Sequence, residues 1–269
     1  MTMDEHFAQN SRGGTQLRRR WKTDGARGAV LIVHGIGEHS GRYVHVGDHL
    51  AARGYDVLAY DQVGFGQSEG RRGHVDSFDD YLDDVEALLA ERRELDVPVV
   101  LIGHSLGGLV SATYLEDGRP QPDLAVLSAP ALGAVVPAWQ RVMAPIIGRV
   151  APKVFIPSKI DGAVLSHDPQ VQSDYENDPL GVQGATAGLG RALFEAMDRA
   201  SERIGQIGVP TYVLQGTADE LVPPHFTAPL ASLPTVTYRS WDGLRHECFN
   251  EYEKNDVMDE MADWIDQRL

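Results

Sequence analysis

Residues 97–116 read VPVVLIGHSLGGLVSATYLE, which combines a strand pattern, a serine between glycines and a helix pattern. Residues 97–102 are apolar almost throughout, which is typical of a buried strand in a parallel sheet. The pentapeptide GHSLG at 103–107 follows at once, and residues 106–116 can form a helix. So tight a turn from strand to helix requires glycine on both sides of the serine, because side chains there would clash. The stretch therefore predicts that Ser105 is held exposed at the amino terminus of a helix, where it can act as a nucleophile.

Strand-like and helix-like segments alternate along most of the chain. Residues 43–53 and 78–95 have apolar side chains at helical spacing with charges on the other face. Short apolar runs, typical of buried strands, occupy residues 29–33, 55–60, 124–127, 211–215 and 235–241. This order predicts the α/β class, with a mostly parallel central sheet flanked by helices.

Residues 133–205 interrupt the alternation. They contain few strand candidates, several prolines, and amphipathic stretches at 139–150 and 188–204. Because open α/β sheets bind ligands at the carboxyl ends of their strands, we expect this segment to be a helical cap over that edge. The chain then divides into a core from 1 to 132, a cap from 133 to 205, and a second part of the core from 206 to 269.

Composition limits the classes of partner and the cellular setting. The chain has 269 residues and a formal net charge of -15, which argues against nucleic acid as a partner because phosphate binding needs a basic surface. Cys248 is the only cysteine, so no disulfide can form within the chain. We read no export signal in residues 1–10 and no uninterrupted apolar span, and therefore expect a cytoplasmic protein, at most peripheral to a membrane. The oligomeric state is not indicated.

A serine hydroxyl needs a base to take its proton, and that base needs a carboxylate to orient it. Asp219 follows the strand candidate at 211–215, and His246 follows the one at 235–241, which gives the chain order Ser, Asp, His. The sequence therefore favours Ser105, Asp219 and His246 as a catalytic triad. Rival residues remain: Glu220 and Asp242 as the carboxylate, and His225 as the imidazole.

Backbone donors for an oxyanion are expected from two loops. One is the N–H after the nucleophile, that of Leu106, and the other is the N–H of Ile36 in the glycine-containing loop after the strand candidate at 29–33. The nearby His34, Glu38 and His39 lack the spacing of a helical zinc site. We expect no metal.

The stretch GFGQSE at 64–69 was weighed as a nucleotide-binding loop. It has Glu69 where the dinucleotide fingerprint needs its third glycine. We therefore expect no cofactor.

These residues resemble the monoacylglycerol lipase and lysophospholipase group of α/β-hydrolases, also described as serine aminopeptidase-like hydrolases. The resemblance is carried by HGIGEHSGRY at 34–43, DQVGFGQSEGRRGHVDSFDDYLDDV at 61–85 and GHSLGG at 103–108, supported by GTADELV at 216–222 and RHECFNE at 245–251. It covers nearly all of the chain except the cap. It implies the α/β-hydrolase fold, Ile36 and Leu106 as oxyanion donors, a monoacylglycerol substrate, an apolar acyl tunnel under the cap, and no cofactor.

Other functions remain open beside this one. They are a lysophospholipase or broad carboxylesterase, a peptidase or amidase, which uses the same triad chemistry, and a non-catalytic ligand-binding protein.

Several further residues receive weaker interpretations. Glu38, Arg72 and His74 lie in loops expected to flank the glycerol side, where they could bind substrate hydroxyls. Residues 18–20 are three consecutive arginines, interpreted as the solvated edge of the first strand. Residues 137–157 are unusually apolar for an insertion. We expect most of them to pack against the core beneath and a minority to face lipid, in transient contact of the cap with a membrane surface.

Overall fold

An eight-stranded, mostly parallel sheet forms the centre of the computed structural model, which describes residues 3–269 apart from the side chains of Ala138 and Gln140. The strand order is β1-β2-β4-β3-β5-β6-β9-β10, and β2 runs antiparallel to both of its neighbours. The strands are β1 (Met3–Gln9), β2 (Thr15–Trp21), β3 (Gly28–Val33), β4 (Tyr55–Tyr60), β5 (Val99–His104), β6 (Leu124–Ser128), β9 (Thr211–Gly216) and β10 (Val236–Trp241). This arrangement confirms the predicted α/β fold with a mostly parallel sheet.

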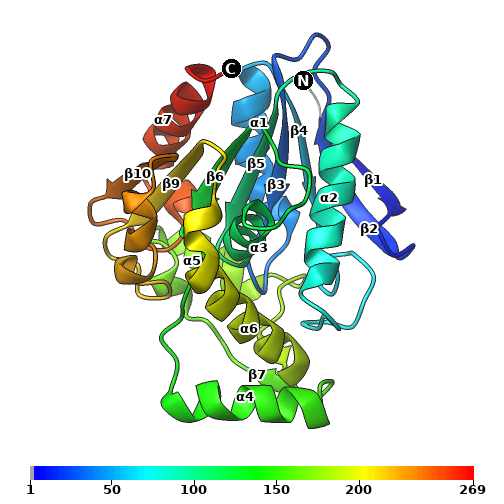
Figure 1. Cartoon of the computed structure of the whole chain (residues 1–269), viewed down its shortest axis with the longest axis vertical. Helices are drawn as coiled ribbons and strands as arrows, with labels where there is room; N and C mark the ends of the chain where they lie inside the picture. Colours follow the sequence, from blue (N-terminus) through cyan, green and yellow to red (C-terminus); the bar gives the residue numbers. More distant parts are fainter. Residues whose placement is uncertain (1–2) are drawn as a thin grey trace.

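Helices cover both faces of this sheet, as Figure 1 shows. Alternate side chains of β3 point to opposite faces, so Leu31 packs in one apolar cluster and Val30 in the other. The helices are α1 (Val44–Ala52) and α7 (Lys254–Asp266) on one face, and α2 (Asp79–Arg93), α3 (Leu106–Leu115) and α6 (Ala187–Arg203) on the other. Burial on both faces explains why the central strands are continuous apolar runs.

A helical insertion separates β6 from β9. Its elements are α4 (Ala138–Val150), β7 (Phe155–Pro157), α5 (Pro169–Asn177), β8 (Gly184–Thr186) and α6, with β7 and β8 paired as a small antiparallel sheet. In Figure 1 the helix α4 lies at the opposite end of the molecule from the two termini. The insertion falls where the cap was predicted, while its division from the core at 133 and 205 stays a prediction.

The remaining helical elements are short 3-10 helices. They are η1 (Ser40–Tyr43), η2 (Gly162–Val164), η3 (Ile204–Gln206), η4 (Pro224–Phe226), η5 (Ala228–Ser232) and η6 (Cys248–Asn250). Three of them, η1, η4 and η6, lie in loops that follow the strands β3, β9 and β10. The strand predicted at 97–102 is shifted in the structure and runs from Val99 to His104. Pro98 has no N–H to donate to a neighbouring strand, and its carbonyl makes the first bond to β3 by accepting from the Ala29 N–H at 2.8 Å. β5 therefore leads directly into Ser105.

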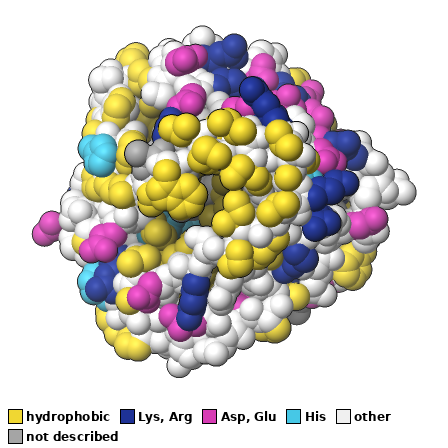
Figure 2. Space-filling view, turned by 90° about the horizontal axis from the view of Figure 1, so that it is seen from below, with side chains coloured by type: hydrophobic (Ala, Val, Ile, Leu, Met, Phe, Trp, Pro, Cys, Tyr) yellow, Lys and Arg dark blue, Asp and Glu magenta, His cyan; other side chains and the backbone are white. Residues whose placement is uncertain are grey.

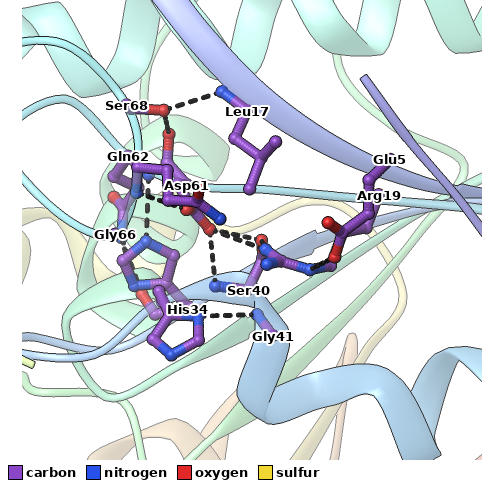
Figure 3. A network of polar contacts seen from close by, with 12 residues as sticks. Glu5, Leu17, Arg19, His34, Ser40, Gly41, Asp61, Gln62, Gly66 and Ser68 are labelled. Atoms are coloured by element: carbon purple, nitrogen blue, oxygen red, sulfur yellow. Dashed lines mark hydrogen bonds and ion pairs between the residues drawn. The ribbon is translucent and has the colours of Figure 1, made fainter. Parts of the chain in front are cut away.

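The arginines at 18–20 do not form a solvated edge, and that interpretation was wrong. They lie on β2, which is not an edge strand because β1 pairs with it on its outer side. The Arg19 side chain is almost fully buried. Arg19 donates to Glu5 at 2.8 Å and to Asp61 at 3.0 Å, and Asp61 also accepts from the Ser40 N–H at 2.9 Å. Figure 3 shows Arg19 and Asp61 pointing toward each other across this network. The network joins β2 to the loop after β3 and to the loop after β4.

Replacing Arg19 with methionine should lower the free energy of unfolding by about 3 kcal/mol, because the buried Asp61 carboxylate would lose its cation. The matched control is Lys22→Met, since Lys22 is 73% exposed and its ion pair with Asp24 spans 3.8 Å. The control should change stability by less than about 0.5 kcal/mol. Urea unfolding of the three proteins measures the difference. Equal effects of the two substitutions would contradict a structural role for the buried pair.

Candidate active site

Ser105 stands between β5 and α3 in a backbone conformation that residues with a Cβ rarely adopt. Its φ is 51° and its ψ is -113°. Such a conformation costs about 1–3 kcal/mol and persists only where surrounding structure enforces it. Here the Ser105 N–H donates to the Ser128 carbonyl at 3.0 Å, and the Ser105 carbonyl accepts from the Ala131 N–H at 3.0 Å. The result is the strained turn from strand to helix that the pattern around Ser105 predicts.

Three glycines beside Ser105 have no room for a side chain. A Cβ on Gly103 would overlap the carbonyl of Gly107, and a Cβ on Gly107 would overlap the carbonyl of Val33. On Gly108, a Cβ would lie only 2.7 Å from the Cα of Pro130. Glycine at these positions therefore lets β3, β5 and α3 approach one another closely enough to hold the serine at the turn.

Asp219 and His246 meet from two separate loops at the same edge of the sheet. The Nδ1 atom of His246 lies 2.8 Å from Oδ2 of Asp219, and both side chains are buried. Asp219 also accepts from the N–H groups of Leu221 and Val222, each at 2.9 Å, and from the Gln215 amide at 2.9 Å. With its Nδ1 proton donated to Asp219, the ring of His246 has Nε2 free to act as a base.

The charges around this pair shift both pKa values in the direction that catalysis needs. Burial alone would raise the pKa of Asp219, but His246 and the hydrogen bonds to the carboxylate hold it below its ordinary value. Burial alone would lower the pKa of His246, but the charge and hydrogen bond of Asp219 raise it overall. Asp219 is therefore ionised at neutral pH, and His246 is set to exchange a proton.

The rival residues are not brought to this pair. Glu220 is exposed, Asp242 is exposed and accepts from the Thr217 hydroxyl at 3.3 Å, and His225 stacks on Phe226 with ring centroids 4.1 Å apart. None of the three rivals lines the cavity that Ser105 and His246 share.

That cavity has a volume of about 280 Å³ and is lined by core loops and by the insertion. Ser105 and His246 are both in its wall, although no hydrogen bond joins the serine hydroxyl to the imidazole among residues 3–269. Such contacts are often long in a hydrolase without substrate and tighten when one binds. The cavity is strongly apolar on its other sides, where its wall includes Ala134, Val136, Leu193, Phe194, Met197 and Val222.

Two backbone N–H groups in the wall are free to donate. Ile36 and Leu106 both line the cavity, and neither N–H donates to a protein group within the described part of the chain. Leu106 is the first residue of α3, where a helix leaves its N–H unsatisfied. These are the two donors expected from the sequence, and they can serve a developing oxyanion.

Glu38 lies in the cavity wall, but most of its bonding capacity is taken up by the protein. Its Oε1 accepts from the Gly35 N–H and from the Tyr43 hydroxyl at 2.6 Å, and its Oε2 lies 3.2 Å from Nε of Arg42. It therefore orients the loop that carries Ile36, and only the face toward the cavity is open to a ligand. Although burial opposes it, the Arg42 charge holds the pKa of Glu38 below its ordinary value.

Sequence reasoning missed the partners that surround Glu38. Arg42 also donates to Glu247 at 2.5 Å, and its guanidinium lies 5.0 Å from the centre of the Tyr175 ring of the insertion. Burial raises the pKa of Glu247, with the Arg42 charge acting against it. We refer to Glu38, Arg42, Tyr43, Tyr175 and Glu247 as the Arg42 cluster. The sequence indicated Glu38 and the adjacency of Glu247 to His246, but it could not join them, because the members of the cluster come from three distant parts of the chain.

Arg72 and His74 lie outside the cavity wall. Arg72 donates to the carbonyls of Gly66 and Leu180, and His74 contacts the Thr186 hydroxyl at 2.7 Å. Both residues therefore tie a core loop to the insertion, and the geometry gives no support to their assignment as substrate-binding residues.

The described residues form neither a metal-binding group nor a membrane-spanning helix. Within 3–269, no group of three histidine, cysteine or carboxylate side chains is placed to hold a metal ion. In the same range, no helix combines the length and apolar character needed to cross a membrane.

Comparisons with known proteins agree with this geometry. The family model described as "Serine aminopeptidase, S33" matches residues 24–253. A monoacylglycerol lipase of Mycolicibacterium smegmatis is 31% identical, over all of this chain and 99% of its own length, and phospholipase YtpA of Bacillus subtilis is 31% identical over 93% of this chain and 99% of its own.

A crystal structure of Paleococcus ferrophilus monoacylglycerol lipase superimposes with a TM-score of 0.87 and 31% identity, covering 94% of this chain and 98% of that one. With its parallel sheet, its serine at the turn from β5 to α3 and these relatives, the chain is a carboxylic ester hydrolase that belongs to the serine aminopeptidase S33 family, in the monoacylglycerol lipase group of α/β-hydrolases.

Proposed function

We propose that this enzyme hydrolyses monoacylglycerols to fatty acid and glycerol through an acyl-enzyme formed on Ser105. The observation that carries the proposal is the position of Ser105: it lies in the wall of a mostly apolar cavity, and the lining carboxylates Glu38 and Glu247 act electrostatically on His246. An apolar wall suits an acyl chain, and the polar side suits an alcohol. Relatives named monoacylglycerol lipase add support.

In the proposed mechanism, Nε2 of His246 takes the proton of the Ser105 hydroxyl as its oxygen attacks the ester carbonyl. The tetrahedral oxyanion accepts from the N–H groups of Ile36 and Leu106, and Asp219 stabilises the imidazolium that forms. His246 then gives the proton to the leaving alkoxide, and glycerol departs. Water, deprotonated by the same imidazole, attacks the acyl-enzyme and releases the fatty acid with Ser105 regenerated.

The insertion supplies the acyl side of the cavity in this proposal. Leu193, Phe194 and Met197 lie on α6, which is in contact with α4. We therefore keep 133–205 as a cap over the site. Two hydrogen bonds connect the cap to the core. One joins Nε2 of His39 and Oδ2 of Asp178 at 2.9 Å, and in the other the Glu247 N–H donates to the Leu165 carbonyl at 2.8 Å.

The outer face of α4 supports the proposal of contact with a lipid surface. Trp139, Val142, Met143, Ile146 and Val150 recur at helical spacing and are all exposed, Val150 by 83%. Figure 2 shows hydrophobic side chains gathered around a hollow on this end of the molecule. An exposed apolar stripe of this kind is typical of interfacial helices, which enter a membrane surface without spanning it.

Fatty-acid release should be fastest from monoacylglycerols and slower from di- and triacylglycerols, and an aminoacyl amide should release no amine. The Ser105→Ala variant should lose at least about 10³-fold in kcat/KM, because the nucleophile is removed. Fatty-acid release is measured for the acylglycerols at matched acyl chains of graded length, and amine release for the amide. Selective cleavage of the amide would favour the peptidase alternative, and no serine-dependent turnover would favour a binding protein.

The pH dependence of kcat/KM should follow His246. Activity requires the neutral imidazole, so the rate should rise with pH through a midpoint above 6.5, because Asp219 raises the pKa of His246. In Asp219→Asn the rate should fall by about 10⁴-fold and the midpoint should move to lower pH. Profiles from pH 5 to 9 on p-nitrophenyl butyrate test this. An unmoved midpoint in the variant would contradict the assignment.

Two charges on the outer face of α4 should weaken binding to liposomes. The variant is Val142→Glu with Val150→Glu. Its control is Phe7→Glu with Tyr252→Glu, at exposed apolar positions on β1 and in the turn before α7. Co-sedimentation should fall at least about fivefold for the α4 variant only, with hydrolysis of p-nitrophenyl butyrate retained. If both variants bind liposomes like the unmodified protein, α4 is not the contact surface.

A further inference from the structure

Two carboxylate oxygens in the cavity wall accept no hydrogen bond within residues 3–269: Oε2 of Glu38, which is buried beside Arg42, and Oε1 of Glu247. Glu247 is 4% exposed, and its Oε2 accepts from Arg42 at 2.5 Å and from the Asn250 amide at 2.9 Å. Its Oε1 accepts no hydrogen bond from any residue between 3 and 269. Since Glu247 lines the cavity and the unpaired oxygen of Glu38 is buried beside Arg42, Oε1 of Glu247 is the carboxylate oxygen left to a ligand.

The charged side chains in the cavity wall are all acidic among the described residues. Among the described residues, Glu38 and Glu247 line the cavity and no lysine or arginine does. Arg42, which is not itself in the wall, is the one cation shared by both carboxylates. When all three are ionised the group keeps one net negative charge, so the wall faces a ligand as a hydrogen-bond acceptor.

The position of Glu247 decides which part of the substrate it meets. In the proposed mechanism His246 protonates the leaving alkoxide, so the alcohol must lie beside the imidazole. Glu247 lines the same cavity, and its charge acts on His246. A free hydroxyl of glycerol can donate to a carboxylate. A phosphate at the same place offers only acceptors and carries like charge, and placing like charges together costs several kcal/mol.

We propose that Glu247 is a specificity-determining residue that selects a leaving alcohol presenting a hydroxyl to its Oε1 and disfavours one presenting a phosphate there. Its Oε1 accepts a hydrogen bond from that hydroxyl, and its negative charge opposes an anionic phosphate at the same place, as in lysophosphatidic acid. This inference rests on the proposed function. It separates this chain from a lysophospholipase that would share the same triad.

The test compares Glu247→Gln with Glu253→Gln, which removes the same charge from an exposed side chain outside the cavity. Each protein is assayed at pH 8.5 with octanoylglycerol and octanoyl lysophosphatidic acid. The unmodified enzyme should favour octanoylglycerol strongly in kcat/KM. That preference should shrink about tenfold or more in Glu247→Gln and stay within about twofold in Glu253→Gln.

Two further readouts make the outcome decisive. Hydrolysis of p-nitrophenyl butyrate, whose leaving group has no hydroxyl to donate, reports on the remaining machinery. In the unmodified enzyme, glycerol should inhibit that hydrolysis at a concentration at least about tenfold below that of glycerol 3-phosphate, even if Glu247→Gln fails to fold.

An unchanged preference in an active Glu247→Gln enzyme, or equal inhibition by the two alcohols, would overturn the role of Glu247. Absence of serine-dependent hydrolysis of octanoylglycerol in the unmodified enzyme would instead overturn the proposed function, and this inference with it.

Discussion

The backbone of Ser105 is the constraint on which the rest of the site depends. A φ of 51° in a residue with a Cβ is unfavourable by about 1–3 kcal/mol, and it is enforced by the Ser105 N–H bond to β6 and by the close approach of α3 to β3. The same geometry leaves the Leu106 N–H unpaired at the start of α3 and places the serine in the cavity wall. Nucleophile and oxyanion donor are thus two consequences of one strained turn.

Buried carboxylates organise the loops around that turn, each through a different set of partners. Asp61 joins β2 to the loops after β3 and β4, Asp219 orients His246, and Glu38 fixes the loop that carries Ile36. A buried carboxylate without partners would be strongly destabilising, and most of these oxygens are satisfied by N–H groups or by Arg19 and Arg42. Oε1 of Glu247 departs from this pattern, which is why we assign it to the substrate.

The sequence predicted the fold and the core of the candidate site, because both depend on local patterns. Continuous apolar runs identified the central strands, and the glycines beside Ser105 identified the turn. The Arg42 cluster was out of reach, since Arg42 and Glu247 are separated by 205 positions and no local pattern joins them. The burial of Arg19 could not be predicted for a related reason. Three consecutive arginines are typical of a solvated segment, and only the folded chain shows that β1 pairs along the outer side of β2 and that Asp61 lies beside Arg19. Arg72 and His74 were predicted to bind substrate because they lie in loops near the site. In the structure their side chains bond to Leu180 and Thr186 of the insertion.

The most direct measurement is the site of covalent labelling by a fluorophosphonate, identified by peptide mass spectrometry. We expect one adduct, on the peptide that contains Ser105, formed at least about 10³-fold more slowly in His246→Ala because the hydroxyl then lacks its base. An adduct on a different serine, or labelling of Ser105 at an unchanged rate without His246, would contradict the central claim that this turn holds an activated nucleophile.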